Sequence, residues 1–301
     1  MSAGNARSRE AAFARRTQLF LPADRPARAA KAATSGADAV LVDLEDSLPP
    51  DGRPAARAGL AGLVAAVRAA RPVPVLVRVN SDDLAVDVEA AVLAAADGVL
   101  VPKVESAATV HEVEDLLDDA ERRHGLRAGS LEVQLLVETP RGLLAAADIA
   151  AAGARTVAMV LGVEDLAAEL DVDPTSPYAD LRWAHATVLC AARAHGLAPY
   201  GLLGSLTNFR DLPALAEDAR RSRGFGYLGA LCIHPAQVEV LAEAFGPTAE
   251  EVAHAEAVVA AMEQAEREGH AAAQLDGRMV DTPVAVRARR LLARAHRPSA
   301  G

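Results

Sequence analysis

The sequence predicts a (β/α)8 barrel, the TIM-barrel form of the α/β class, with a C-terminal helical arm or lid. Short runs rich in Val and Leu alternate with longer Ala-rich segments of helical period. Eight such runs can be counted, and 301 residues are enough for one large α/β domain. A doubly wound open parallel sheet is the alternative, because the strand count separates the two folds and one sequence gives that count only approximately.

Each strand candidate is a short β-branched or Leu-rich run that ends in polar or turn-forming residues. In chain order the candidates are TQLFLP from Thr17, AVLVDLE from Ala39, VPVLVRVN from Val73, GVLVPKV from Gly98, EVQLLVET from Glu132, TVAMVLGVED from Thr156, GLAPYGLL from Gly196 and LGALCIHP from Leu228. Segments of helical period separate them, such as PARAAKAATSGA after the first strand, DLAVDVEAAVLAAA after the third and AATVHEVEDLLDDAERR after the fourth.

The pattern changes after the eighth strand. PTAEEVAHAEAVVAAMEQAEREG predicts a long amphipathic helix from near Thr248, with two glutamates suited to the positive end of its dipole. A loop, Asp281 and a last helix beginning at Pro283 follow. We therefore expect a flexible N-terminus over residues 1–15, a catalytic barrel over 16–247, and a helical extension and lid over 248–301.

The composition limits the class of protein. Hydrophobic residues make up 51% but aromatic residues only 3%, so the core must be built from Ala, Val and Leu, which suits helices packed on buried strands. A net charge of -10 argues against nonspecific nucleic-acid binding, and no uncharged apolar run is long enough to span a membrane. With no signal peptide and two cysteines expected to be buried free thiols, the protein is expected in the cytoplasm, without nucleic-acid or membrane partners.

Polar residues gather where the predicted strands end. Four apolar residues run directly into Asp43, which is followed by Glu45 and Asp46, and such a cluster is costly unless cations, donors or solvent meet it. The later strand ends carry Arg78 and Asn80, Lys103, Glu138, and Glu164 with Asp165. Any one of these alone is best interpreted as a solvated turn residue.

Together, these residues place several carboxylates and two cations on one rim, because a barrel gathers its chemistry at the C-terminal strand ends. Carboxylates without a His or Cys cluster suit a hard ion such as Mg²⁺. Two other motifs do not indicate a site. GFGYLG, Gly224 to Gly229, has the letters of a dinucleotide fingerprint but follows a helix and precedes a strand, so it predicts a helix C-cap and turn. His234, a lone strand-end histidine, is expected to be a structural hydrogen-bonder.

An ordered set of motifs resembles the HpcH/HpaI aldolase/citrate lyase family, particularly its citrate lyase beta-like and malyl-CoA lyase branch. The resemblance runs from about Arg16 to the last helix. Its pieces are RTQLFLPADRPARAAKA, GADAVLVDLEDSLPP, VRVN, VPKVES, VETPRGLLAAADIA, LGVEDLAAEL, GALCIHPAQVEV and LDGRMVDTP. It implies a TIM barrel, an Mg²⁺ cofactor and a homo-oligomer, either a trimer or a hexamer.

The resemblance also implies roles for individual residues. Glu138 and Asp165 resemble the Mg²⁺ ligands, and Arg78 resembles the arginine that faces the reacting oxygen of the substrate. Glu45 would organise Arg78 or metal-bound water. Asp281 resembles an acid/base that a lid delivers, often into a neighbouring subunit.

The expected contacts to coenzyme A (CoA) come from the first loop and helix. Arg25 and Lys31 resemble residues that meet CoA phosphates. Three departures concern the acyl and thioester pocket: Ala23 replaces a usual glycine, Tyr200 a usual aspartate and Ala230 a common lysine.

The implied reaction cleaves or forms a short 3-hydroxyacyl-CoA thioester, such as malyl-, citramalyl- or citryl-CoA, with a 2-oxo acid as the other partner. Three related outcomes are a thioesterase, a citryl-carrier-protein lyase subunit acting with an acyl-carrier protein, and a Schiff-base aldolase using Lys103. A catalytically idle CoA-ester-binding subunit is the alternative from another class. The presence of Glu138, Asp165 and Asp281 argues against it. Without the Schiff base, Lys103 is expected to pair with rim carboxylates.

Overall fold

All eight predicted strands are present in a computed structural model, which describes residues 3–172, 179–207 and 209–295. They are β1 (Thr17–Pro22), β2 (Ala39–Asp43), β3 (Val75–Arg78), β4 (Gly98–Val101), β5 (Glu132–Val137), β6 (Thr156–Leu161), β7 (Ala198–Tyr200) and β8 (Ala230–Cys232). The chain divides into two units, Met1–Phe245 and Gly246–Gly301, two residues before the expected boundary. Residues 1–2 and 296–301 of the expected terminal segments lie outside the described residues.

The strands form one parallel sheet in the order β7-β6-β5-β4-β3-β2-β1-β8. An isolated parallel bridge between Tyr200 and Gly229 joins the two edges, so the sheet closes into a nearly complete barrel. The predicted barrel is therefore confirmed and the open doubly wound sheet is excluded. The C-terminal strand ends consequently meet at one rim, where a barrel places its site.

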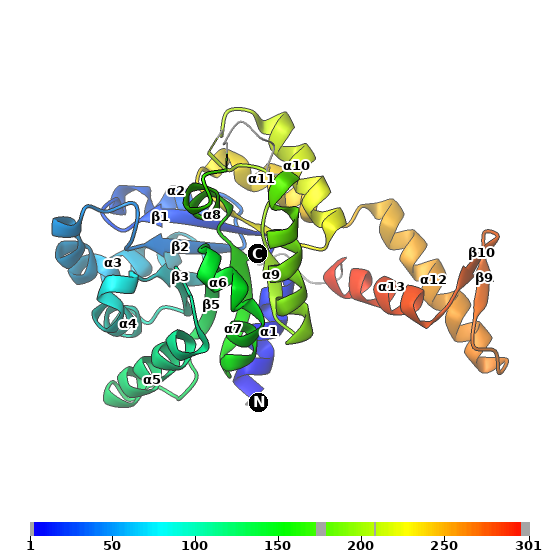
Figure 1. Ribbon diagram of the computed structural model, residues 1–301, viewed down its shortest axis with the longest axis horizontal. Coiled ribbons are helices and arrows are strands. Elements are labelled where there is room, and N and C mark those ends of the chain that lie inside the picture. Colours follow the sequence, from blue (N-terminus) through cyan, green and yellow to red (C-terminus); the bar gives the residue numbers. More distant parts are fainter. Residues whose placement is uncertain (1–2, 173–178, 208, 296–301) are drawn as a thin grey trace. The chain divides into compact units, whose positions relative to one another are not determined.

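Helices cover the outside of the strands (Figure 1). They are α2 (Ala29–Ala33), α3 (Arg53–Ala70), α4 (Leu84–Leu93), α5 (Ala107–Arg123), α6 (Pro140–Leu144), α7 (Ala146–Ala152), α8 (Val163–Glu169), α9 (Arg182–Ala194), α10 (Leu212–Phe225) and α11 (Pro235–Phe245). Short 3-10 turns are η1 (Pro26–Arg28), η2 (Pro50–Gly52), η3 (Ser81–Asp83) and η4 (Ala179–Leu181). The GFGYLG motif ends α10 as expected, because Gly226 takes the C-cap position with a φ of 124°.

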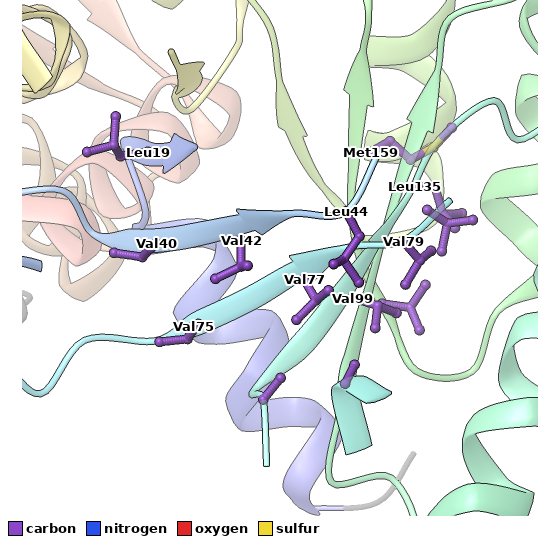
Figure 2. Close-up of a cluster of buried hydrophobic side chains, with 14 of the residues drawn as sticks. Leu19, Val40, Val42, Leu44, Val75, Val77, Val79, Val99, Leu135 and Met159 are labelled. Carbon is purple, nitrogen blue, oxygen red and sulfur yellow. The ribbon is translucent and has the colours of Figure 1, made fainter. Parts of the chain in front are cut away.

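Successive side chains of each strand pack in two different cores. In β2, Val40 and Val42 belong to the large core between strands and helices, part of which Figure 2 shows, whereas Ala39 and Leu41 belong to the barrel interior. The strands are apolar throughout because both of their faces are buried. The alternation also determines which strand-end side chains point into the mouth of the barrel.

The N-terminal stretch, expected to be flexible, forms a helix, α1 (Ala3–Ala14). It is held at the N-terminal ends of the strands by buried polar contacts. Arg15 forms a buried ion pair with Glu132 at the start of β5, and the Tyr200 hydroxyl donates to the backbone oxygen of Ala12. Ala12 is fully buried in the barrel interior cluster. The helix itself was not expected, because the polar sequence of α1 gives no sign of its burial against the barrel.

The C-terminal unit contains α12 (Ala249–Arg267), β9 (Ala273–Leu275), β10 (Arg278–Val280) and α13 (Thr282–Ala295). Thr248 and Glu251 form the capping box of α12, so this helix begins as predicted. The expected loop instead contains an antiparallel hairpin. Asp276 and Gly277 form its two-residue turn with φ values of 50° and 75°, the conformation that an Asp-Gly pair favours in hairpins.

Two further expectations concern membranes and cysteines. Within the described part of the chain, no helix is long and apolar enough to cross a membrane. Both cysteines are free, but Cys190 is exposed on α9 and only Cys232 is buried. The expectation of two buried thiols was therefore wrong for Cys190, because an apolar neighbourhood in sequence does not decide which face of an amphipathic helix a residue occupies.

Candidate active site

A cavity of about 780 Å³ opens at the C-terminal ends of the strands. This volume lies within the usual range for small-molecule sites. The walls combine apolar residues of β1, β6 and β8 with charged residues from several strand ends and from η1 and α2. The charged residues most relevant to chemistry are Arg28, Lys31, Arg78, Glu138 and Asp165.

The strand alternation explains why Arg78 and Glu138 share this cavity. Each lies two positions after a leucine of the interior cluster, Leu76 in β3 and Leu136 just before the end of β5. Because side chains two residues apart in a strand lie on the same face, both polar groups continue the interior row and emerge at the mouth.

Arg78 is the cation that meets the acidic end of β2. Its Nε and Nη2 donate to the two carboxylate oxygens of Asp43, each at 2.7 Å, a bidentate pair between residues that are register partners in adjacent strands. Its Nη1 lies 2.8 Å from an oxygen of Asp46 and 2.9 Å from an oxygen of Glu45. The expectation that these carboxylates face a cation is confirmed.

Burial and charge shift the pKa values of two carboxyl groups beside Arg78 in opposite directions. Burial opposes the ionisation of Asp43, but the hydrogen bonds and charge of Arg78 outweigh it and hold its pKa below the ordinary value. For Glu45, burial dominates over the attraction of Arg78 and raises its pKa to about 7. Glu45 does not line the cavity, and its contact with the site is the ion pair with Nη1 of Arg78.

Glu138 is buried with one oxygen engaged by the backbone. The N–H of Lys103 donates to Oε1 of Glu138 over 2.9 Å, and Lys103 has a φ of 50°, a strained value for a residue other than glycine. Gly162 leaves the space for the carboxylate, because a Cβ there would lie 2.5 Å from Oε2 of Glu138. Burial and then the charge of Asp165 raise the pKa of Glu138 to about 8.

Asp165 lies in the first turn of α8, exposed beside the cavity, so an aqueous ligand reaches both it and Glu138. The neighbouring Glu164 also lines the cavity and accepts a hydrogen bond from Ser205. Among the described residues, no group of three His, Cys, Asp or Glu side chains could hold a metal ion. Two carboxylates would leave further positions around a metal ion to water or substrate oxygens, which is the usual arrangement for Mg²⁺.

The segment after β1, formed by η1 and α2, supplies two cations to the cavity, but only one of them was expected. Lys31 lines the cavity as predicted, whereas Arg25 does not and lies with its Nε 3.3 Å from a carboxylate oxygen of Asp24. The second cation that lines the cavity is Arg28, which the sequence analysis did not single out. The sequence signal for Arg28 was its position three residues before Lys31, because residues three apart in a helix lie on the same face.

Lys103 is not brought into the cavity, and Asp281 belongs to the other of the two units. Lys103 is exposed and does not line the cavity, and among the described residues it makes no ion pair. Its charge still acts on the rim carboxylate Glu45 and opposes the rise of that group's pKa, so the expected attraction to a rim carboxylate is present without a direct contact. Its left-handed backbone directs its N–H to Glu138 while its side chain faces solvent. Asp281 belongs to the C-terminal unit and accepts the Val284 N–H at 3.2 Å, which makes it the N-cap of α13.

The three departures from the family pattern occupy different places. Ala230 lines the cavity, so a lysine there would add a charge directly to its wall. Tyr200 is buried and its hydroxyl bonds to Ala12, so it helps hold α1 rather than contacting the cavity. Ala23 is buried and does not line the cavity either.

Comparisons with known proteins identify the same family as the sequence motifs. The family model for HpcH/HpaI aldolase/citrate lyase matches residues 16–235. The chain belongs to this family. Among curated family members, it is 32% identical over 281 residues to the citrate lyase subunit beta of Leuconostoc mesenteroides subsp. cremoris, covering 92% of each chain. It is 34% identical over 289 residues to an L-malyl-CoA/beta-methylmalyl-CoA lyase of Cereibacter sphaeroides, covering 88% of this chain and 90% of that one.

Solved structures of the family agree in fold. One is the protein CitE of Mycobacterium tuberculosis in complex with magnesium, acetoacetate and coenzyme A, with a TM-score of 0.74 and 36% identity, covering 94% of this chain and 99% of that one. Another is the citrate lyase beta subunit of the same organism complexed with oxaloacetate and magnesium, with a TM-score of 0.62 and 37% identity, covering 78% and 99%.

Proposed function

We propose that this protein is an Mg²⁺-dependent carbon–carbon lyase that cleaves or forms a short 3-hydroxyacyl-CoA thioester such as malyl-, citramalyl- or citryl-CoA. The observation that carries the proposal is a single cavity that combines Arg78, Glu138 and Asp165 with the cations Arg28 and Lys31. The first three suit the reacting end of an oxo acid, and the last two suit phosphate oxygens. Family relatives named as lyases of citrate and malyl-CoA support this assignment.

The residues fit a magnesium ion. Burial, and after it the charge of Asp165, raises the pKa of Glu138, so a dication between the two carboxylates would relieve an existing repulsion. Oε1 of Glu138 accepts the Lys103 N–H, which fixes the orientation of the carboxylate. When bound, Mg²⁺ would act as a Lewis acid toward the carboxylate and hydroxyl or carbonyl oxygens of the substrate.

The remaining steps belong to protein groups. Arg78, fixed by Asp43 and Glu45, stabilises negative charge on the oxygen that becomes the carbonyl of the 2-oxo acid. Asp281 exchanges the proton at the α-carbon of the acyl thioester as general acid and base.

Three finer assignments accompany this function. We propose that the protein works as a homo-oligomer, a trimer or hexamer, and that it acts in the cytoplasm, where its two free cysteines suit a reducing compartment. A citryl thioester on an acyl-carrier protein would be an additional substrate, because carrier proteins present the same thioester arm as CoA. Size-exclusion chromatography with light scattering tests the oligomer.

A thioester panel tests the activity. Purified protein with Mg²⁺ is incubated with malyl-, citramalyl- and citryl-CoA, and the products are analysed for 2-oxo acid, acetyl-CoA and free CoA. Equal release of oxo acid and acetyl-CoA supports the lyase. Free CoA without oxo acid would identify a thioesterase, and no product from any thioester would favour a binding subunit without catalysis.

Gly162→Ala is expected to weaken Mg²⁺ binding. The new Cβ would lie 2.5 Å from Oε2 and 2.6 Å from the Cβ of Glu138, so the carboxylate must move. We expect an apparent Mg²⁺ affinity roughly tenfold lower, the size of a perturbed ligand position, measured by isothermal titration calorimetry. Gly224→Ala in α10 is the control, because a Cβ there meets nothing within 4 Å. Equal Mg²⁺ affinity in the wild type and Gly162→Ala would mean that Glu138 is not a ligand.

Replacing Arg28 and Lys31 together with Ala is expected to weaken CoA-ester binding. Each of the two substitutions removes one charged contact to phosphate. The dissociation constant of the CoA ester should therefore rise about 10- to 100-fold in the double variant, while turnover at saturation changes little. Arg25→Ala is the matched control, because this arginine lies on the same segment but outside the cavity. A larger effect from Arg25→Ala than from the double variant would restore the original assignment of Arg25.

A further inference from the structure

Gln237 lies where two loops of the cavity wall meet. Its side chain is fully buried in the first turn of α11. One neighbouring segment is the β7–α10 loop over residues 201–207, which contributes Leu206 and Thr207 to the cavity. The other is the β8–α11 turn, which contributes Ile233 and His234. Gln237 itself does not line the cavity, so it acts on any ligand only through these loops.

Three hydrogen bonds use both ends of the Gln237 amide. Its Oε1 accepts the backbone N–H of Ile233 at 2.9 Å and of His234 at 3.1 Å, and its Nε2 donates to the carbonyl oxygen of Leu206 at 2.8 Å. Backbone N–H groups only donate and carbonyl oxygens only accept, so one orientation of the amide satisfies all three partners. A methionine can make none of these bonds, and an ionised glutamate cannot make the bond to Leu206.

The β7–α10 loop depends on side chains for its position. The Leu203 N–H donates to the hydroxyl of Ser222 at 2.7 Å, and the Thr207 N–H donates to the hydroxyl of Ser205 at 3.1 Å. A second link between the two loops is the stacking of Phe209 on His234, with ring centroids 4.8 Å apart. Phe209 is exposed, so the buried Gln237 amide is the link that solvent cannot replace.

We propose that Gln237 is a positioning residue that sets the spacing of the two wall loops and thereby the affinity for the thioester ligand. The identity of the ligand rests on the proposed function, whereas the loop spacing rests on the hydrogen bonds alone. Arg78, Glu138 and Asp165 lie on other elements of the barrel, at β3, after β5 and in α8. Substitution of Gln237 therefore acts on ligand affinity more than on the rate of the chemical step.

The test compares Gln237→Glu and Gln237→Met with the wild type. For Gln237→Glu, which loses one buried hydrogen bond, we expect the KM for the CoA thioester and the dissociation constant of CoA to rise about tenfold, with kcat changed less than about threefold. Gln237→Met loses all three bonds and should raise both constants at least as much. Amide hydrogen exchange over residues 201–207 should accelerate in both variants. Gln264→Glu on the exposed face of α12 is the matched control and should leave all these values unchanged.

The outcomes separate the positioning role from a purely structural one. Faster exchange over 201–207 with unchanged KM and CoA affinity would make Gln237 only structural and would overturn the proposal. Unchanged exchange and affinity would overturn it as well. Gln237→Glu keeps both bonds to Oε1 and decides the question if Gln237→Met does not fold. Failure of the proposed function would appear differently, as absence of CoA-thioester binding by the wild-type protein.

Discussion

Glu138→Gln is expected to abolish Mg²⁺-dependent turnover and, at the same time, to stabilise the metal-free protein. The first effect follows because a neutral amide is a poorer ligand than a carboxylate for a hard dication, and we expect a loss of at least about 100-fold in kcat/KM. The second follows from the buried position of Glu138 beside Asp165. Glu138 would then be a carboxylate that binds the metal but destabilises the metal-free fold. A carboxylate with a purely structural role would instead destabilise the fold when it is replaced.

The sign of the stability effect follows from the raised pKa. Burial, then the charge of Asp165, raises the pKa of Glu138 to about 8, above its ordinary value of 4.5. The stabilising contribution of the protonated carboxyl is thus complete below about pH 4.5 and is lost as the pH rises through about 8. The wild type in EDTA should therefore lose stability across this window, and Glu138→Gln should not show this loss.

Thermal unfolding in EDTA checks this prediction. At about pH 8 we expect Glu138→Gln to melt roughly 2–3 °C above the wild type, the shift that one to two kcal/mol produces in a chain of this size, and the gap should close near pH 5. Asp165→Asn is the matched control, because Asp165 is exposed. It should also lose Mg²⁺-dependent turnover, but with a smaller gain in stability.

The opposite results would assign another chemistry. Undiminished turnover of both variants in EDTA, together with trapping of substrate on Lys103 by borohydride, would favour a Schiff-base aldolase. The structure already argues against that mechanism. Lys103 presents its backbone N–H to Glu138 while its side chain remains exposed outside the cavity.

The barrel was predictable because eight short apolar runs alternate with Ala-rich segments of helical period, and the composition of its mouth was predictable because polar residues follow the ends of those runs. Arg78 and Glu138 continue the interior rows of Leu76 and Leu136, so strand boundaries alone place both side chains in the same cavity. The acidic end of β2 was interpretable for a related reason, since its register partner Arg78 was the obvious cation to meet it.

Features that depend on contacts distant in sequence were not predictable in the same way. The polar α1 is held by an ion pair between Arg15 and Glu132, which are 117 positions apart. The hairpin turn at Asp276 and Gly277 had a clear local signal, the Asp-Gly pair, but its flanking strands are only three residues long and carry little periodicity. The exchange of Arg25 for Arg28 at the cavity depends on where a short helix begins, the least predictable property of an element.

The capping contact at Asp281 makes its substitution a clean test of acid/base catalysis. The Asp281 carboxylate accepts the Val284 N–H, and its backbone oxygen accepts the Ala285 N–H. Asn keeps an oxygen for the first of these bonds and is an equally good N-cap. Asp281→Asn should therefore retain the melting temperature, Mg²⁺ binding and thioester binding of the wild type.

The same variant is expected to lose catalysis, because an amide cannot exchange a proton with carbon. Cleavage of the thioester, and exchange of the methyl protons of acetyl-CoA with solvent measured by NMR in D₂O, should both fall by about 10²–10⁴-fold. Loss of cleavage with full methyl-proton exchange would assign the acid/base elsewhere. Glu45 would then be the first candidate, because burial raises its pKa to about 7, within reach of proton exchange near neutral pH.

Mixing variants tests whether Asp281 serves a neighbouring copy of the chain. An oligomer that combines Asp281→Asn with Glu138→Gln subunits contains some sites with an intact Glu138 from one chain and an intact Asp281 from the other. Activity should then reappear after subunit exchange, at a fraction set by the mixing ratio, although neither variant is active alone. No recovery after demonstrated exchange would mean that Asp281 acts within its own chain.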